Sequence, residues 1–289
     1  MIRNFILYML GTFPELLFKM KYYKATGGKL NTRNPKTLYD KIAYLMFKTD
    51  TSSWSLLADK VMVRKIISQW GYADILPALL GTWENANDID FDSLPNSFVL
   101  KTNNASATNI IVKDKNKLDV EEVKQKLRKW LCIDYGRITG QPHYSKIKPL
   151  ILAEEFLIDE KTTKVGKLLV DYKFYCINGV PKYVQVMCDR KENSHDMKLQ
   201  VFDMNWKAHP EFISSYHELA PETLERPLSF ERMISFAKKL SVGFDFVRVD
   251  LYDVNNRPIL GELSFTPGFD TFTESFMREL GESLVLAKK

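Results

Sequence analysis

The chain has 289 residues, and its content of 45% hydrophobic and 27% charged residues excludes both a disordered chain and a membrane-embedded protein. Its 41 basic and 36 acidic residues leave a net charge of +5, spread along the chain without a dense Lys/Arg run. So mild an excess suits an anionic small ligand or an anionic surface and argues against nucleic acid as a partner. The three cysteines form no CxxC pair, which argues against a disulfide framework and favours a reducing, cytoplasmic location.

The N-terminal segment contains an apolar run, Phe5–Leu10, that is too short to span a bilayer and is followed by Gly11 and Pro14. It lacks the long apolar core and the cleavage site of a signal peptide. We expect an amphipathic helix that either docks on the rest of the protein or makes a peripheral contact with the inner membrane face. The second alternative is compatible with the side chains that follow, namely Lys19, Lys21, Tyr22, Tyr23 and Lys24.

Residues 1–75 are expected to be helical, and three segments of the chain have clear helical periodicity. Asp59–Trp70 carries an apolar stripe and ends before Gly71, a typical helix stop. Asp119–Leu131 and Ser229–Leu240 are each amphipathic and each begin with a residue that can cap a helix.

Short β-rich runs, several of them paired as hairpins, lie between and after these helices. A small polar loop joins the first two runs, an Asn178-Gly179 turn divides a hairpin, and a second hairpin is expected to turn at Asn255–Arg257. The expected strand regions are Phe98–Thr102, Asn109–Lys113, Pro149–Leu157, Lys167–Asp189 and Phe246–Phe265. Because regular β-α-β alternation is missing, the order predicts an α+β fold dominated by antiparallel sheet.

The second hairpin contains Asp250, Glu262 and Ser264. With a three-residue turn, Asp250 lies opposite Glu262 and both carboxylates share one face, whereas a two-residue turn would put Asp250 opposite Gly261. Opposed carboxylates repel each other unless a cation or a proton lies between them, and Mg²⁺ prefers such hard oxygen ligands. The alternative is a pair of acids on a solvent-facing surface.

Three weaker patterns accompany this hairpin. Lys101 lies near the end of an apolar strand, before a loop of small residues. Its ammonium group and the N–H groups of the loop could hold phosphates. The alternative is that Lys101 is simply a lysine at a strand edge. Glu154 ends a buried strand and could contact adenine or ribose. Asp171 and Lys173 share one strand face and could simply form an ion pair.

The order of these patterns is more specific than any one of them. A DKxxxR helix, a strand with a lysine, an EE pair, a hairpin, an RVD block and an ExxxxPG block follow one another as in ATP-grasp enzymes. More narrowly, the chain resembles the TupA-like ATP-grasp family of teichuronopeptide biosynthesis. The matching stretches are Asn34–Leu45, Leu57–Ile67, Asp88–Asn103, His143–Leu157, Asp171–Val186, Phe246–Val254 and Gly261–Gly268.

The resemblance implies an ATP-grasp fold, in which two α+β lobes grip ATP between antiparallel sheets, here with a helical region at 1–75 and lobes at 76–157 and 158–289. It implies ATP and Mg²⁺ as cofactors. Catalytic roles are implied for Lys101, Lys173 and Arg248. The implied nucleotide-binding residues are Lys101, Ser106, Glu154, Glu155, Phe156, Leu157 and Asp171. The implied metal ligands are Asp250, Glu262 and Ser264, and Arg190 is the implied contact of the substrate carboxylate.

The function implied by the resemblance is an ATP-dependent carboxylate–amine ligase that makes an amide through an acyl-phosphate, acting on a carboxylated sugar or amino acid in surface polysaccharide biosynthesis. Alternatives are a sugar kinase on the same fold, a glycosyltransferase, or a nucleotide-binding pseudoenzyme in an assembly complex. The last alternative is motivated by a departure from the family. The loop after Lys101 has Asn104, Ala105 and Ala107 where a histidine and glycines are expected, and positive φ is costly without glycine.

Overall fold

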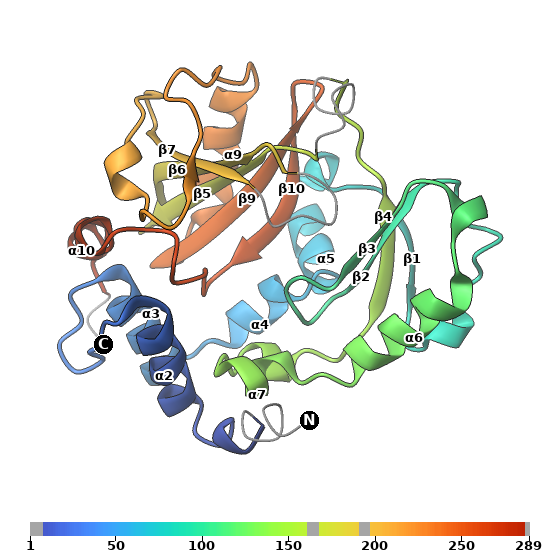
Figure 1. The fold of residues 1–289 in the computed structure, drawn as a ribbon, viewed down its shortest axis with the longest axis horizontal. Coiled ribbons are helices and arrows are strands. Elements are labelled where there is room, and N and C mark those ends of the chain that lie inside the picture. The colour runs from blue at the N-terminus through green and yellow to red at the C-terminus, as the bar shows by residue number, and fades with distance from the viewer. Residues whose placement is uncertain (1–7, 161–167, 191–196, 287–289) are drawn as a thin grey trace. The chain divides into compact units, whose positions relative to one another are not determined.

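The computed structural model describes residues 8–160, 168–190 and 197–286 (Figure 1). The chain divides into two compact units. Unit 1 comprises Met1–Phe18 and Asp50–Leu157, and unit 2 comprises Lys19–Thr49 and Ile158–Lys289. In the described part of the chain, no helix combines the length and the apolar character needed to cross a membrane.

Unit 1 is built on a four-stranded antiparallel sheet in the order β1-β4-β2-β3. Its strands are β1 (Leu79–Trp83), β2 (Phe98–Thr102), β3 (Asn109–Val112) and β4 (Ile151–Glu155). Its helices include α4 (Ser52–Ala58), α5 (Met62–Gln69), α6 (Val120–Leu131) and α7 (Tyr135–Thr139).

The core of unit 1 follows from the alternation along β2. Phe98 and Leu100 are fully buried and pack with Val123 and Leu127 of α6, so Lys101, the residue after Leu100, faces the other side of the sheet. The cap predicted for α6 is confirmed, because the Asp119 side chain accepts a hydrogen bond from the third residue of the helix.

The helix predicted over Asp59–Trp70 is shorter than expected. The observed helix α5 starts at Met62, because the Asp59 carboxylate accepts hydrogen bonds from the N–H groups of Val61 and Met62 and so ends the preceding turn. Trp70, expected on the apolar stripe, is 41% exposed. Gly71 has a φ of 85°, the left-handed conformation expected of a helix stop.

Unit 2 contains a six-stranded sheet in the order β10-β9-β5-β6-β7-β8, which is antiparallel except for the β7–β8 pair. The strands are β5 (Asp171–Ile177), β6 (Val180–Cys188), β7 (Lys198–Asp203), β8 (Glu218–Leu219), β9 (Phe246–Val254) and β10 (Arg257–Ser264). The helices of this unit include α3 (Leu38–Lys48), α9 (Phe230–Ser241) and α10 (Glu274–Ser283), and α2 (Pro14–Thr26) extends into it.

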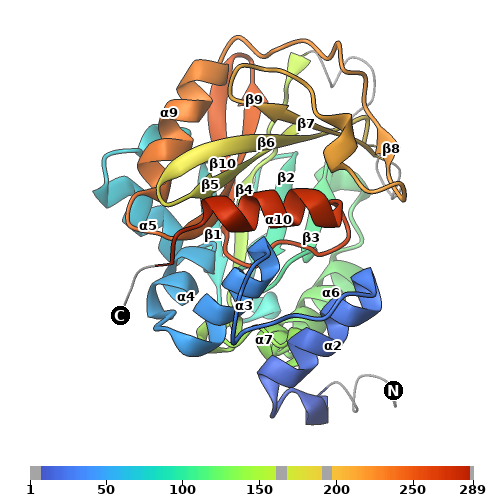
Figure 2. The ribbon, with the colours of Figure 1, turned by 90° about the vertical axis from the view of Figure 1, so that its left-hand side faces the viewer.

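Helices cover both faces of this sheet (Figure 2). On one face the Phe230 ring of α9 lies 5.8 Å, centroid to centroid, from Phe174 of β5. On the other face, the Phe276 ring of α10 lies 5.0 Å from Tyr183 of β6. The Ser229 side chain does not cap α9 as predicted, because its hydroxyl donates instead to Asp253 at 3.0 Å. That bond ties the start of α9 to strand β9.

Candidate functional site

The β9–β10 hairpin places Asp250 opposite Glu262, although the turn is not the one predicted. The turn has two residues, Asn255 and Asn256, both with positive φ, and Arg257 already pairs with Val254. A regular ladder from that turn would put Asp250 opposite Gly261. A β-bulge between Leu260 and Glu262 shifts the register by one residue and restores the pairing.

Gly261 can form this bulge because it has no side chain. A Cβ atom at this position would lie 3.0 Å from the Tyr252 ring and 3.3 Å from the Asp250 carbonyl oxygen. The glycine therefore allows the backbone to pass close to Tyr252 while Glu262 turns to the face that carries Asp250.

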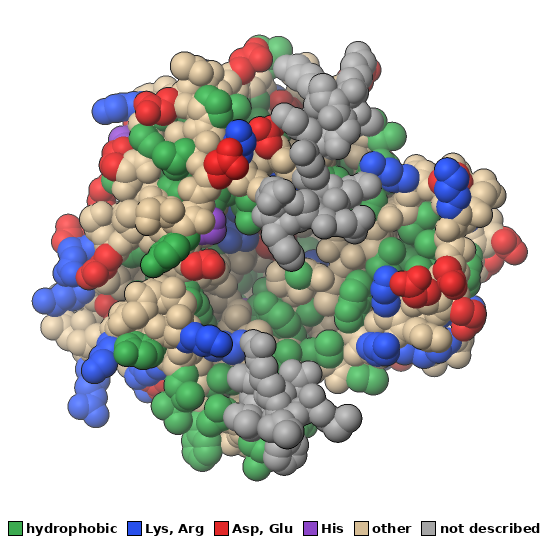
Figure 3. Space-filling view, in the orientation of Figure 1, with side chains coloured by type: hydrophobic (Ala, Val, Ile, Leu, Met, Phe, Trp, Pro, Cys, Tyr) green, Lys and Arg blue, Asp and Glu red, His purple; other side chains and the backbone are tan. Residues whose placement is uncertain are grey.

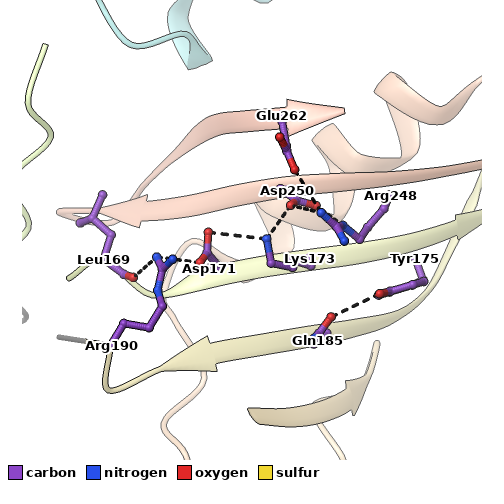
Figure 4. Close-up of polar contacts among 9 residues, drawn as sticks. All are labelled: Leu169, Asp171, Lys173, Tyr175, Gln185, Arg190, Arg248, Asp250 and Glu262. Atoms are coloured by element: carbon purple, nitrogen blue, oxygen red, sulfur yellow. Dashed lines mark hydrogen bonds and ion pairs between the residues drawn. The ribbon is translucent and has the colours of Figure 1, made fainter. Parts of the chain in front are cut away.

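Asp250 is the centre of a buried charge network on this face of the sheet (Figure 4). Arg248 donates from Nε to Oδ1 and from Nη2 to Oδ2 of Asp250, both at 2.7 Å. Lys173 donates to Oδ2 at 2.6 Å, and Arg248 also reaches Oε1 of Glu262 at 3.1 Å. The arrangement follows from register, since Lys173 lies opposite Asp250 and residues two apart on β9 share a face.

The neighbouring cations determine the protonation state of Asp250. Burial alone would raise the pKa of its carboxyl group, but Arg248 and Lys173 outweigh burial and hold the pKa below its ordinary value. Burial would likewise lower the pKa of Arg248, but Asp250 and the other anions beside it raise that pKa well above the ordinary value. At neutral pH both groups are therefore charged.

A second ion pair involves Asp171, which lies two residues before Lys173 on β5. Arg190 Nη2 is 2.7 Å from Oδ2 of Asp171 and donates to the carbonyl oxygen of Leu169 at 3.1 Å. Lys173 is 3.8 Å from the other oxygen of Asp171. Asp171 Oδ2 and Arg190 Nε are buried, and neither makes a well-aligned hydrogen bond with the residues that the structure describes, so this pair keeps hydrogen-bonding capacity for a further partner.

Sequence reasoning missed three residues on this face: Tyr175, Gln185 and Tyr252. The Tyr175 hydroxyl donates to Gln185 at 3.2 Å, and burial raises the pKa of Tyr175 to about 12. Asp171 and burial raise the pKa of Tyr252 well above its ordinary value. The period-two pattern could have found both tyrosines, because Tyr175 follows Lys173 and Tyr252 follows Asp250 by two positions.

Unit 1 contains a separate cluster around Glu154 on β4. Lys101 of β2 donates to one carboxylate oxygen of Glu154, and Arg64 of α5 donates to the other at 2.7 Å. Arg64 also donates to the carbonyl oxygen of Pro77. The side chain of Lys101 is 25% exposed, whereas that of Glu154 is 8% exposed. Glu154 thus orients two cations, of which Lys101 is the more accessible.

The loop after Lys101 is anchored by the residues that precede α5. Asn103, which is fully buried, donates to the Asp59 carboxylate at 2.9 Å, and the Lys60 ammonium group donates to the carbonyl oxygen of Ala105 at 2.6 Å. Ala107 has a φ of 59°, which is a left-handed conformation. The loop therefore adopts a backbone conformation that favours glycine at a position that is occupied by alanine.

The remaining predicted residues lie at the ends of these elements. Glu155 is tied to the neighbouring chain, since its N–H donates to the Ala78 carbonyl oxygen at 3.0 Å and its carboxylate accepts from the Ala78 N–H at 2.7 Å. Phe156 and Leu157 are partly exposed and follow β4, and Ser106 is exposed in the loop.

Asp250, Glu262 and Ser264 offer a donor set that suits Mg²⁺. All are oxygen ligands on one face, and the Glu262 side chain is 34% exposed. Both oxygens of Asp250 already accept from cations, so a metal there would have to replace Lys173 or Arg248 at one oxygen. Among the residues that the structure describes, no group of three or more His, Cys, Asp or Glu side chains could hold a metal. Further ligands would therefore come from phosphate and water.

Comparison with known proteins gives the family. The sequence model described as TupA-like ATP-grasp matches residues 40–285. No curated protein matches this sequence. Similar solved structures include D-alanine–D-alanine ligase from Bacillus anthracis complexed with ATP, with 14% identity, a TM-score of 0.46, and 76% of this chain and 58% of that chain covered.

Another similar structure is the ATP-grasp ligase PsnB complexed with a minimal precursor, with 12% identity and a TM-score of 0.42. That match covers 82% of this chain and 62% of PsnB, so the chain spans less than two thirds of the length of either protein. The predicted α+β, ATP-grasp fold is confirmed. Because the match to the family model covers most of its length, the chain belongs to the TupA-like ATP-grasp family.

Proposed function

We propose that the protein is an ATP-dependent ligase that joins a carboxylate to an amine. The observation that carries the proposal is the Asp250 network, in which two carboxylates and two cations share one face of the unit 2 sheet, in a chain of the ATP-grasp family. Such a network offers groups for a divalent metal and for phosphate oxygens, and it offers no nucleophile. Catalysis by positioning and charge neutralisation needs none.

The proposal assigns each cluster a part in holding the nucleotide. Lys101, oriented by Glu154, binds phosphate oxygens, and Ser106 adds a hydroxyl donor from the loop that Asp59 and Lys60 hold. Asp250, Glu262 and Ser264 hold Mg²⁺, which, when bound, neutralises charge on the phosphates. Glu155, Phe156 and Leu157 contribute backbone and side-chain contacts to adenine and ribose.

The cations of unit 2 act on the reacting groups. A substrate carboxylate oxygen attacks the γ-phosphorus and ADP leaves; the lone pair of an amine then attacks the acyl carbon and phosphate leaves. Lys173 and Arg248 stabilise the negative charge that spreads over the phosphoryl oxygens. Their hydrogen bonds with Asp250 already restrict both side chains, so less rotamer entropy remains to be lost.

The carboxylate substrate is assigned to Arg190. Its pairing with Asp171 fixes the guanidinium at the edge of the network while the Arg190 side chain stays 29% exposed, so a substrate carboxylate can add a hydrogen bond to the guanidinium. We propose a carboxylated sugar or an amino acid as the substrate, and an amide product used in surface polysaccharide biosynthesis in the cytoplasm. The family resemblance supports this assignment.

Calorimetry on the full chain tests the nucleotide site. ATP with Mg²⁺ should bind the wild type more tightly than ATP alone, and Glu262→Gln should remove that difference because it removes a ligand charge. Glu222→Gln, a change at an exposed glutamate, is the matched control and should keep it. No binding by the wild type under either condition would contradict the proposal.

Product analysis then tests the reaction. Incubation with ATP, candidate carboxylates and amines should release ADP and free phosphate in equal amounts with an amide product. ADP together with a phosphorylated sugar would instead identify a kinase. ATP binding without turnover of any substrate pair would leave the protein as a nucleotide-binding member of a complex and would contradict the ligase assignment.

A further inference from the structure

A line of large apolar side chains is exposed along helix α2. Phe13, immediately before the helix, is 65% exposed, Leu16 is 51%, Met20 is 47% and Tyr23 is 56% exposed. Successive members are three or four positions apart, the spacing at which residues lie above one another on one side of a helix. We call these four residues the α2 stripe.

The α2 stripe is separate from the face that α2 uses for its own packing. Leu17, Phe18 and Tyr22 are 1%, 1% and 8% exposed. Phe18 and Tyr22, four positions apart, lie on the side of the helix away from the stripe, and Leu17 is buried at its border. Tyr22, which sequence reasoning grouped with a surface contact, is therefore part of the interior, where its ring lies 5.7 Å from Tyr39. Because the helix is already anchored by these residues, the stripe contributes little to the core.

The net positive charge of the chain falls within the segment that contains this stripe and is not spread evenly along the chain, as the composition had suggested. Between Tyr8 and Thr37 the sequence has six basic residues and one acidic residue, an excess of five that equals the +5 of the whole chain. The basic residues are Lys19, Lys21, Lys24, Lys29, Arg33 and Lys36, and the acidic one is Glu15. Of these, Lys24, Lys29, Arg33 and Lys36 are exposed.

The surface view agrees with this distribution. Figure 3 shows hydrophobic side chains gathered over the α2 region with Lys and Arg side chains beside them. Scattered exposed apolar residues are common on proteins, but a line of large apolar side chains in a segment with a net positive charge offers a lipid surface both apolar contacts and attraction to anionic headgroups. Lysines beside such a line can extend their stems along it and reach anionic headgroups.

A second copy of the chain is a poorer occupant of this surface. A symmetric dimer through the α2 stripe would place the same patch on both subunits and bring its positive excess against itself. An anionic bilayer instead compensates the charge, and it accepts the apolar side chains at the boundary between headgroups and acyl chains. Charge complementarity therefore favours lipid.

We propose that the α2 stripe and the basic residues around it dock the protein peripherally on an anionic phospholipid surface. The inference depends only on α2 and its surroundings, so it stands independently of the proposed ligase activity. Phe13, Leu16, Met20 and Tyr23 would enter the interface, and Lys24, Lys29 and Arg33 would contact phosphate groups. Such a contact would be reversible and sensitive to salt, because screening weakens the attraction of the lysines.

Co-sedimentation with vesicles tests the proposal on the full chain. Binding should be measurable to vesicles of equal parts phosphatidylcholine and phosphatidylglycerol, weak to phosphatidylcholine alone, and reduced by added salt. Leu16→Ser with Met20→Ser should abolish it, whereas the matched control Leu228→Ser with Val242→Ser, at residues 79% and 68% exposed, should not. Lys24→Glu with Lys29→Glu should weaken binding by more than tenfold, at roughly fivefold for each lysine lost, and Lys65→Glu with Lys238→Glu should change it far less.

Equal binding of the stripe variant and its control to anionic vesicles would overturn the proposal. So would a dimer in sedimentation velocity that the stripe variant abolishes while vesicle binding is absent, since the surface would then belong to a second copy. All variants change exposed side chains, and circular dichroism with thermal unfolding confirms that each remains folded before binding is compared. ATP affinity measured on the same variants separates this test from that of the proposed function.

Discussion

Replacing Ala107 by glycine should stabilise the protein, although alanine-to-glycine changes usually destabilise. Ala107 has a φ of 59°, and a left-handed conformation costs an L-residue roughly 1–2 kcal/mol because Cβ crowds the backbone. Glycine removes that cost but adds about 0.4–1 kcal/mol of entropy to the unfolded chain. Ala107 is exposed, so no packing is lost. We expect a net gain of about 0.5–1 kcal/mol.

The matched control is the same substitution two residues earlier. Ala105 is 2% exposed and does not have positive φ, so Ala105→Gly should lose buried methyl contacts and gain only unfolded-state entropy. It should destabilise by about 1–2 kcal/mol. Urea unfolding followed by tryptophan fluorescence should therefore move in opposite directions for the two variants. A lower midpoint for both would show that the left-handed conformation of Ala107 carries no strain, and the reasoning would be wrong.

Three further predictions concern buried charges and the register of the hairpin. Arg248→Met should lower the free energy of unfolding by about 3 kcal/mol, because it leaves the Asp250 carboxylate buried with fewer partners, and adding Asp250→Asn should recover part of this loss. Gly261→Ala should cost about 1–3 kcal/mol through contact with the Tyr252 ring and should weaken the Mg²⁺ dependence of ATP binding. Burial, with a smaller contribution from a nearby lysine, lowers the pKa of His143 to about 3, so the folded state holds the neutral ring. The contribution of His143 to the free energy of unfolding is complete above its unfolded pKa of about 6.5. As the pH is lowered from there to the folded pKa, this contribution falls by up to about 1.4 kcal/mol per pH unit.

Each of these has a result that would contradict it. Urea titrations in which Arg248→Met and the double variant unfold at the same midpoint would contradict the expectation that removing the Asp250 charge recovers stability. An unchanged Mg²⁺ dependence in Gly261→Ala would show that the bulge does not set the position of Glu262. For His143, the comparison is with His143→Phe, measured by unfolding between pH 7 and pH 4. Identical pH dependence in both proteins would place the acid sensitivity elsewhere.

Some features of this protein follow from local sequence. The alternation in FVLKT requires that Lys101 leave the core face that Phe98 and Leu100 occupy. The spacing of Asp171 and Lys173, or of Arg248 and Asp250, requires that each pair share a face, because side chains alternate along a strand. The composition and the order of helices and hairpins likewise suffice for an α+β fold. These properties depend on neighbours in the chain, and backbone geometry determines them.

Other features depend on contacts between distant residues. The register that opposes Asp250 and Glu262 combines a two-residue turn with a bulge at Gly261, where the close approach of Tyr252 leaves little room for a side chain. Arg64 and Glu154 are 90 positions apart, so their ion pair exists only once helix α5 lies against the sheet of unit 1. The concentration of charge near α2 was present in the sequence. Only the tertiary structure separates the buried Tyr22 from the exposed Tyr23, because burial depends on which side of the helix the rest of the protein covers.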